Sequence, residues 1–284
     1  MTQFIRHYLL ALQFFTRIPV AGRLAAWVGY SPQMLRASAA HFPGVGWLIG
    51  SLVAALSTLL LIALPMGGFA PLIVATVGTA FGVLLTGAFH EDGLADVADG
   101  LGGSLQRERA LEIMKDSRVG AFGAIAIVMA LLIKVALVAQ LAYMSASVLC
   151  AGLFLAHVVS RTWPLLLIRL LPHVGDAAGS KSKPLADQIG LLALLAALVW
   201  CGAALVAVVW VQGTWHAVVP VLLQDSLASA LLCAIGASAL AFVWMGRWFA
   251  KRLQGFTGDC LGATQQICEL AFYLGFLLGW GALG

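Results

Sequence analysis

Charged side chains are scarce in this sequence. Asp, Glu, Lys and Arg make up 10% of its 284 residues, whereas a soluble domain usually carries about a quarter. Hydrophobic residues make up 62%, and the mean hydropathy is +0.99. The polar residues are too few to cover a soluble protein of this size, so lipid must be the solvent for much of the chain. The net charge of +4 is modest, and composition gives no support for a nucleic-acid partner.

Cysteine pairs are also lacking. The five cysteines are odd in number, scattered and without a CxxC spacing: Cys150, Cys201, Cys233, Cys260 and Cys268. Most of them lie in apolar runs, where cysteine behaves as a small hydrophobe. The pattern therefore indicates neither a disulfide framework nor a zinc site.

The N-terminal pattern does not predict a cleavable signal peptide. Arg6 and Arg17 interrupt the apolar pattern of the first 20 residues, and no apolar core leads to a small-residue cleavage site. The spacing predicts instead an amphipathic helix at the membrane interface, with one face formed by Phe4, Tyr8, Leu12 and Phe15. We assign residues 1–40 to an N-terminal interfacial segment.

Long apolar runs are abundant. A membrane-crossing helix needs about 20 apolar residues, and seven such runs lie near 44–65, 71–89, 121–143, 146–170, 188–211, 220–246 and 261–282. The sequence therefore predicts an all-α, polytopic membrane protein of about seven transmembrane helices. The predicted fold also contains the N-terminal amphipathic helix and one short cytoplasmic helix. The whole of 1–284 is expected to form a single membrane-embedded domain, with a cytoplasmic loop at 90–120.

Lys and Arg occupy every second connection between these runs. They precede the first run and recur at 107–118, 181–183 and 247–252, whereas the connections near 66–70, 143–146 and 212–219 contain none. Basic loops stay on the cytoplasmic side of a membrane. The N-terminus and the long polar loops are therefore predicted to face the cytoplasm, and the C-terminus the outside.

An acidic run follows the second apolar run. On a helix, Asp92, Asp96 and Asp99 stand at i, i+4 and i+7, so their carboxylates share one face. Like charges at this spacing repel unless a cation lies between them, and carboxylate oxygens suit Mg²⁺. Gly102 and Gly103 follow, and glycines let backbone N–H groups approach an anion. The alternative is a solvated acidic loop whose aspartates cap the next helix.

A second polar stretch, at 107–120, predicts a short amphipathic helix that ends at Gly120. Its functional interpretation is that Lys115 and Arg118, with Ser117 between them, hold phosphate oxygens while Asp116 joins the metal site. The alternative is that these acids and bases pair with one another on the surface.

Charges also occur at the start of the last apolar run and within other runs. Thr257 and Asp259 stand in a glycine-rich approach to a helix, which suits an anion, although Asp259 could simply cap that helix. Glu269 lies about 15 Å deeper at helical rise, where an ionisable residue is a functional candidate. Glu269 either lines a site or pairs with Lys134 or Arg161, the other charges inside apolar runs.

Several motifs together resemble the adenosylcobinamide-GDP ribazoletransferases, also called cobalamin synthases. The matching stretches are Leu12-Gln13-Phe14-Phe15-Thr16-Arg17-Ile18-Pro19, Phe42-Pro43-Gly44-Val45-Gly46, the run from His90 to Gly103, Glu112 to Gly120, Ser160-Arg161, and Thr257-Gly258-Asp259-Cys260-Leu261-Gly262-Ala263. They span nearly the whole chain. Two departures are Glu91, at a position where the family has an apolar residue about as often as an acid, and Gln266, where the family often has glutamate.

The resemblance implies a bacterial inner-membrane enzyme whose active site, at 90–120, faces the cytoplasm. It implies that adenosylcobinamide-GDP and α-ribazole, or its 5′-phosphate, are joined with release of GMP and with Mg²⁺ as cofactor. Asp92, Asp96 and Asp99 are then expected to hold the metal, and His90, Lys115, Asp116 and Arg118 to complete the catalytic group. The expected substrate-binding residues are Arg17, Gly102, Gly103, Ser117, Arg161, Lys181, Lys183, Thr257, Asp259 and Glu269.

Two other functional classes remain open at this point. A secondary transporter would suit the charges inside apolar runs, but transporters tend to have internal repeats, and the acidic motif occurs once. A CDP-alcohol phosphotransferase would need a DGxxAR…GxxxDxxxD arrangement. Here Ala98 and Asp99 follow Asp96, and the required arginine is missing from that motif. The expected partners are the small-molecule substrates and membrane lipid. A second copy of the chain or other enzymes that act on corrinoids are further candidates.

Overall fold

The computed structural model of the chain describes residues 2–65, 67–175, 189–216 and 222–281, and every regular element in these ranges is a helix. The elements are α1 (Thr2–Phe15), α2 (Gly22–Val28), α3 (Pro32–Ser38), a 3₁₀ turn η1 (Ala39–His41), α4 (Phe42–Ala63), α5 (Ala70–Thr86), α6 (Phe89–Gly103), α7 (Arg107–Ile113), α8 (Ala121–Met144), α9 (Ala146–Leu170), α11 (Leu191–His216), α12 (Leu222–Leu253) and α13 (Gly258–Gly281). The all-α prediction is confirmed.

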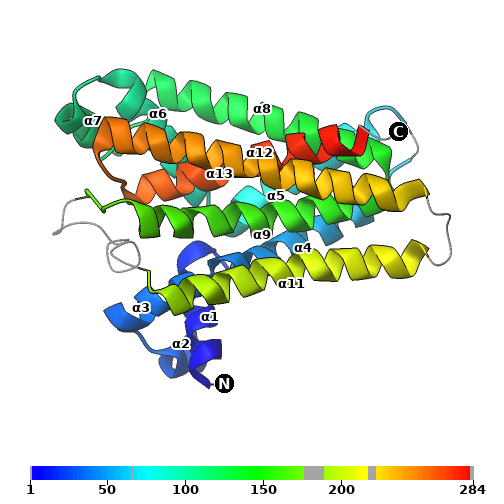
Figure 1. The fold of residues 1–284 in the computed structure, drawn as a ribbon, viewed down its shortest axis with the longest axis horizontal. Coiled ribbons are helices and arrows are strands. Elements are labelled where there is room, and N and C mark those ends of the chain that lie inside the picture. Colours follow the sequence, from blue (N-terminus) through cyan, green and yellow to red (C-terminus); the bar gives the residue numbers. More distant parts are fainter. Residues whose placement is uncertain (1, 66, 176–188, 217–221, 282–284) are drawn as a thin grey trace.

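The long helices lie side by side in one bundle (Figure 1). Six helices of the described chain are long and apolar enough to cross a membrane, and α5 with α6 makes a seventh crossing if this bent pair counts as one. α9 is the central helix, because 83% of its most apolar window is buried, against 17% for α8. The outward faces of α8, α11 and α12 expose large apolar side chains such as Leu132, Val199 and Leu240, as a lipid-facing surface requires.

The two ends of the bundle differ in what they carry. The N-terminal helices, α7 and the junction of α12 with α13 lie at one end, and the C-terminal end of α13 lies at the other (Figure 1). The N-terminal amphipathic helix is confirmed as α1, whose inward face buries Leu12 and Phe15 against the bundle, whereas Phe4 stays 50% exposed.

The segment 90–120, expected to be a loop, is largely helical. α6 occupies Phe89–Gly103 and turns by 89° from α5, while α7 is a shorter helix than expected and ends at Ile113. Two arginines fasten this part to α12: Arg252 Nη2 donates to the carbonyls of Leu101 (3.2 Å) and Ser104 (2.6 Å), and Arg107 Nε donates to the carbonyl of Leu253 (2.7 Å). These bonds occupy carbonyls that the helix ends leave without a partner.

Candidate active site

The bend between α5 and α6 sets the position of the acidic residues. Gly87 has φ +65°, and the N–H groups of Gly87 and Ala88 donate back to the carbonyls of Leu84 and Val83. A left-handed residue of this kind ends a helix, and it lets α6 start in a new direction. Ala88 also has a positive φ, 58°, which is uncommon for a residue with a Cβ.

α6 packs very closely against the start of α13. A Cβ on Gly93 would lie 2.8 Å from the carbonyl oxygen of Asp259, and a Cβ on Gly262 would lie 3.2 Å from the carbonyl oxygen of His90. Only glycine allows such an approach of two backbones. The contact brings Asp92 of α6 and Asp259 of α13, which are 167 positions apart in the sequence, to the same cavity.

A cavity of about 790 Å³ opens at this end of the bundle. Four of the residues around it are charged, namely Arg17, Asp92, Lys115 and Asp259. The others are Gln13, Phe14, Thr16, Thr86, Gly87, Phe89, Gly93 and Gly258. Carboxylates and cations therefore line one space, which suits a ligand that carries phosphate groups together with a metal ion.

Asp96 lies half-buried on α6. The carboxylates of Asp259, Asp92 and Asp99 lie close enough for their negative charges to repel that of Asp96. Crowded carboxylates of this kind favour protonation unless a cation offsets their repulsion. The predicted metal site at Asp92, Asp96 and Asp99 would supply such a cation, and it stays a prediction.

Asp99 has a different environment from the other two aspartates of α6. Its Oδ2 accepts the N–H of Gly120 (2.7 Å) and its Oδ1 accepts the N–H of Gly123 (2.8 Å), so the buried carboxylate sits at the N-terminus of α8. Charge–dipole attraction favours that position. In the described ranges no three His, Cys, Asp or Glu side chains form a group able to hold a metal ion. The structure therefore does not bring the three aspartates together as one ligand set.

The residues after α7 divide between the cavity and the surface. Lys115 lines the cavity, whereas Asp116 and Arg118 pair with each other, with Arg118 Nη2 2.5 Å from Asp116 Oδ2. The Arg118 guanidinium lowers the pKa of the Asp116 carboxyl to about 2. Ser117 is exposed at the surface. The surface pairing that the sequence left open is what this structure shows for Asp116 and Arg118.

Gly102 and Gly103, which the sequence suggested could let backbone N–H groups approach an anion, pack against helices. A Cβ on Gly102 would lie 2.8 Å from Phe122 Cγ, and a Cβ on Gly103 would lie 3.4 Å from Ile113 Cδ1. Packing against α8 therefore requires a glycine at Gly102, whereas a Cβ at Gly103 would make an ordinary contact with α7. Thr257 is close to the cavity, because its hydroxyl donates to Asp259 Oδ2 at 3.2 Å. Lys181 and Lys183 lie outside the described residues.

The charges inside the bundle form a buried network. Lys134 Nζ lies 2.8 Å from Glu269 Oε1, which also accepts the hydroxyl of Tyr273 at 3.0 Å. Arg161 Nη1 donates to the carbonyl of His157 at 2.9 Å. Glu269 thus has the structural pairing with Lys134 that the sequence left open, and neither it nor Arg161 is among the residues that line the cavity.

Several residues of the site and its surroundings are not apparent as candidates from residue type. Gln13 and Thr16 line the cavity although only Arg17 was expected from their motif. Gln266 Nε2 donates to Glu91 Oε1 at 3.0 Å, so the two departures from the family pattern contact each other and join α13 to α6. The two residues are 175 positions apart, and their spacing does not indicate that they meet. His90 is buried, and its ring stacks on Phe42 with centroids 5.7 Å apart.

Gly87 gives a direct test of this cavity. A Cβ at Gly87 would clash with the side chain of Arg17, and its positive φ disfavours alanine as well. We expect Gly87→Ala to displace Arg17 and to raise the KM for a phosphate-bearing substrate about tenfold, in keeping with the loss of one charged hydrogen bond. Gly68→Ala, at a position with open space around it, is the matched control. Equal KM values in the two variants would contradict a role for Arg17 in the cavity.

Comparison with known proteins shows which family the chain resembles. A family model described as cobalamin-5-phosphate synthase matches residues 7–277. The adenosylcobinamide-GDP ribazoletransferase of Albidiferax ferrireducens is 68% identical over 98% of this chain and 100% of its own length. Those of Polaromonas naphthalenivorans and Vibrio cholerae are 58% and 40% identical over 97% and 94% of this chain, and 98% and 91% of their own. No solved structure matches the chain. This chain therefore belongs to the cobalamin-5-phosphate synthase family.

Proposed function

We propose that the chain joins α-ribazole, or its 5′-phosphate, to adenosylcobinamide-GDP and releases GMP. This reaction is the last step in assembling the nucleotide loop of cobalamin. The observation that carries this proposal is the cavity of about 790 Å³, in which Arg17 and Lys115 face the same space as Asp92 and Asp259. A diphosphate needs both signs of charge around it, since cations hold its oxygens and carboxylates hold the metal ion that neutralises it.

The reaction transfers a phosphoryl group. The ribazole hydroxyl oxygen forms a bond to the phosphorus that carries the cobinamide. The bond from this phosphorus to the bridging oxygen breaks, and GMP leaves with that oxygen. The hydroxyl proton passes to a carboxylate of the cavity. Arg17 and Lys115 stabilise the negative charge that spreads over the phosphoryl oxygens, which is how proteins accelerate such transfers.

We propose Mg²⁺ as the cofactor, because carboxylates and cations line this cavity together. It typically binds through one or two carboxylates and completes its shell with substrate phosphates and water, so a group of three protein ligands is not required. We propose Asp92 and Asp96 as its protein ligands, with Asp259 facing them, and Asp99 as the residue that fixes the start of α8. When bound, Mg²⁺ offsets the charge of the diphosphate and of the departing GMP.

The experiment that tests this function measures GMP release. The purified chain in proteoliposomes, supplied with adenosylcobinamide-GDP, α-ribazole and Mg²⁺, should release one GMP for each cobalamin formed. Removing Mg²⁺ with a chelator should stop the release, and adding Mg²⁺ back should restore it. A chain that binds both substrates and forms no cobalamin would contradict the proposal.

We also propose that this cavity faces the cytoplasm of a bacterial inner membrane. The support is the gathering of Lys and Arg at the end of the bundle that carries the cavity. In a cysteine-free background, a label that cannot cross the membrane should reach Gly68→Cys from outside intact cells. It should react with Leu105→Cys, which is 88% exposed in the native chain, only after the cells are opened. The opposite pattern would overturn the orientation.

A further inference from the structure

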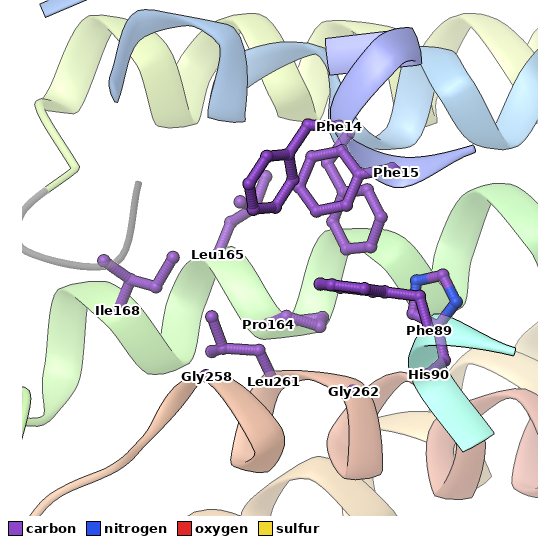
Figure 2. A pocket seen from close by; sticks show the side chains of 11 residues that line it. Phe14, Phe15, Phe89, His90, Pro164, Leu165, Ile168, Gly258, Leu261 and Gly262 are labelled. Carbon is purple, nitrogen blue, oxygen red and sulfur yellow. The ribbon is translucent and has the colours of Figure 1, made fainter. Parts of the chain in front are cut away.

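A second, apolar pocket adjoins the charged cavity. Phe14, Phe89 and Gly258 line both spaces, so the two are contiguous. Five helices build the pocket: α1 and α4 give phenylalanines, α6 gives Phe89 and His90, α9 gives Leu165 and Ile168, and α13 gives Leu261. Figure 2 shows the rings of Phe14 and Phe15 on one side and Leu261 with Pro164 on the other.

The aromatic rings of this pocket form one connected cluster. The ring centroids of Phe14 and Phe89 lie 5.8 Å apart and those of Phe89 and His90 5.5 Å apart, both pairs edge to face. Phe42 stacks on His90 at 5.7 Å. Edge-to-face and stacked rings at these separations attract one another, and the same geometry attracts a further flat ring.

Polar atoms are nearly absent from the lining. His90 is the one residue of the lining with a polar side chain, and its Nε2 is buried with no hydrogen-bond partner in the described part of the chain. A buried polar atom without a partner is uncommon in a folded protein and calls for an explanation. A ligand with a single acceptor at the edge of its ring would supply the missing partner.

We propose that this pocket binds the base of the ribazole substrate, an uncharged fused ring with one unsubstituted ring nitrogen. The inference rests on the proposed function. The base would lie among Phe14, Phe89 and Leu165, accept a hydrogen bond from His90 Nε2–H, and leave the ribose to extend into the charged cavity. Guanine fits this lining poorly, because several of its donors and acceptors would lose water and gain no partner.

Entry of the base requires Phe89 to move. The pocket encloses about 20 Å³ in this structure, room for a single water molecule. Phe89 lines both spaces, is 40% exposed and directly follows Ala88 at the bend, so its movement would widen the pocket. An alanine with a left-handed backbone conformation is strained, and strain of this kind is common where a protein closes on a ligand.

The test compares the two substrates in the full-length chain in proteoliposomes. Leu165→Trp, which fills the pocket at a position outside the charged cavity, should raise the KM for α-ribazole at least tenfold and leave the KM for adenosylcobinamide-GDP within twofold. Phe89→Ala, which removes a ring that lines both spaces, should also raise the KM for α-ribazole, and calorimetry should show weaker α-ribazole binding in both variants. Phe69→Ala, which removes a 76% exposed ring outside both spaces, is the matched control.

His90 is tested with a modified substrate. His90→Phe keeps a ring in the stack and removes the donor, so it should weaken binding of α-ribazole about tenfold. It should not weaken binding of the analogue in which carbon replaces the unsubstituted nitrogen. A purely structural role of His90 would weaken both ligands equally.

The outcomes separate this inference from the proposed function. A wild-type chain that releases no GMP contradicts the function itself. An active wild-type chain whose Phe89→Ala variant keeps its KM for α-ribazole overturns the pocket assignment and leaves the function intact. A rise confined to the KM for adenosylcobinamide-GDP overturns it as well, because the pocket would then serve the other substrate.

Discussion

Replacing Asp92 with asparagine is expected to lower the turnover number about 10²–10³-fold, the usual cost of removing one electrostatic group from a transition state. Asp92 is exposed to the charged cavity together with Lys115 and Asp259. The amide keeps the shape of the side chain but provides no negative charge for Mg²⁺. Removing a charge that the neighbouring carboxylates repel should not destabilise the fold, so thermal unfolding should stay near that of the wild type.

The measurement is GMP release at saturating Mg²⁺ and saturating substrates. Glu108→Gln is the matched control, because this carboxylate is also on the segment after α6, its side chain is 82% exposed, and it is not among the residues lining the cavity. The control should keep full activity. Near wild-type turnover of Asp92→Asn would remove this residue from the site.

Replacing Glu269 with glutamine is expected to destabilise the protein by about 3–5 kcal/mol, the usual cost of leaving one charge of a buried pair without its partner. Glu269 is 1% exposed, and its Oε1 lies 2.8 Å from Lys134 Nζ, whose side chain is 7% exposed. Its Oε2 accepts a hydrogen bond from Nε2 of Gln265, also on α13, at 2.8 Å. The pairing with Lys134 joins α8 to α13. Glutamine keeps part of the hydrogen bonding and leaves the lysine unpaired within the bundle.

The double variant with Lys134→Met and Glu269→Gln separates a structural role from a catalytic one. Removing both charges should restore much of the lost stability, because no unpaired charge remains. The apparent melting temperature in detergent measures this, and GMP release measures activity. A stable double variant without activity would return Glu269 to the substrate-binding residues. A single variant as stable as the wild type would contradict the ion pair.

The sequence by itself determined the solvent, the class of fold and the family. Too few charges to cover a soluble surface, with apolar runs of about 20 residues, leave only helices in lipid, since every backbone group must be satisfied within its own segment. The predicted membrane-crossing runs therefore lie close to the long helices of the structure. The acidic run and the later motifs identified the family, because those residue types stand at fixed positions along the chain.

Only the tertiary structure decided which of these residues meet. Asp92 and Asp259 share a cavity because glycines let α6 and α13 touch, whereas Asp99 faces the start of α8 although helical spacing puts it on the same side of α6 as Asp92. The pairing of Glu269 with Lys134 and the aromatic pocket depend equally on contacts between distant segments. Spacing along one helix predicts neighbours within that helix. Contacts between helices depend on the bend at Gly87 and on the side-chain volumes at each crossing, and a single sequence reveals neither.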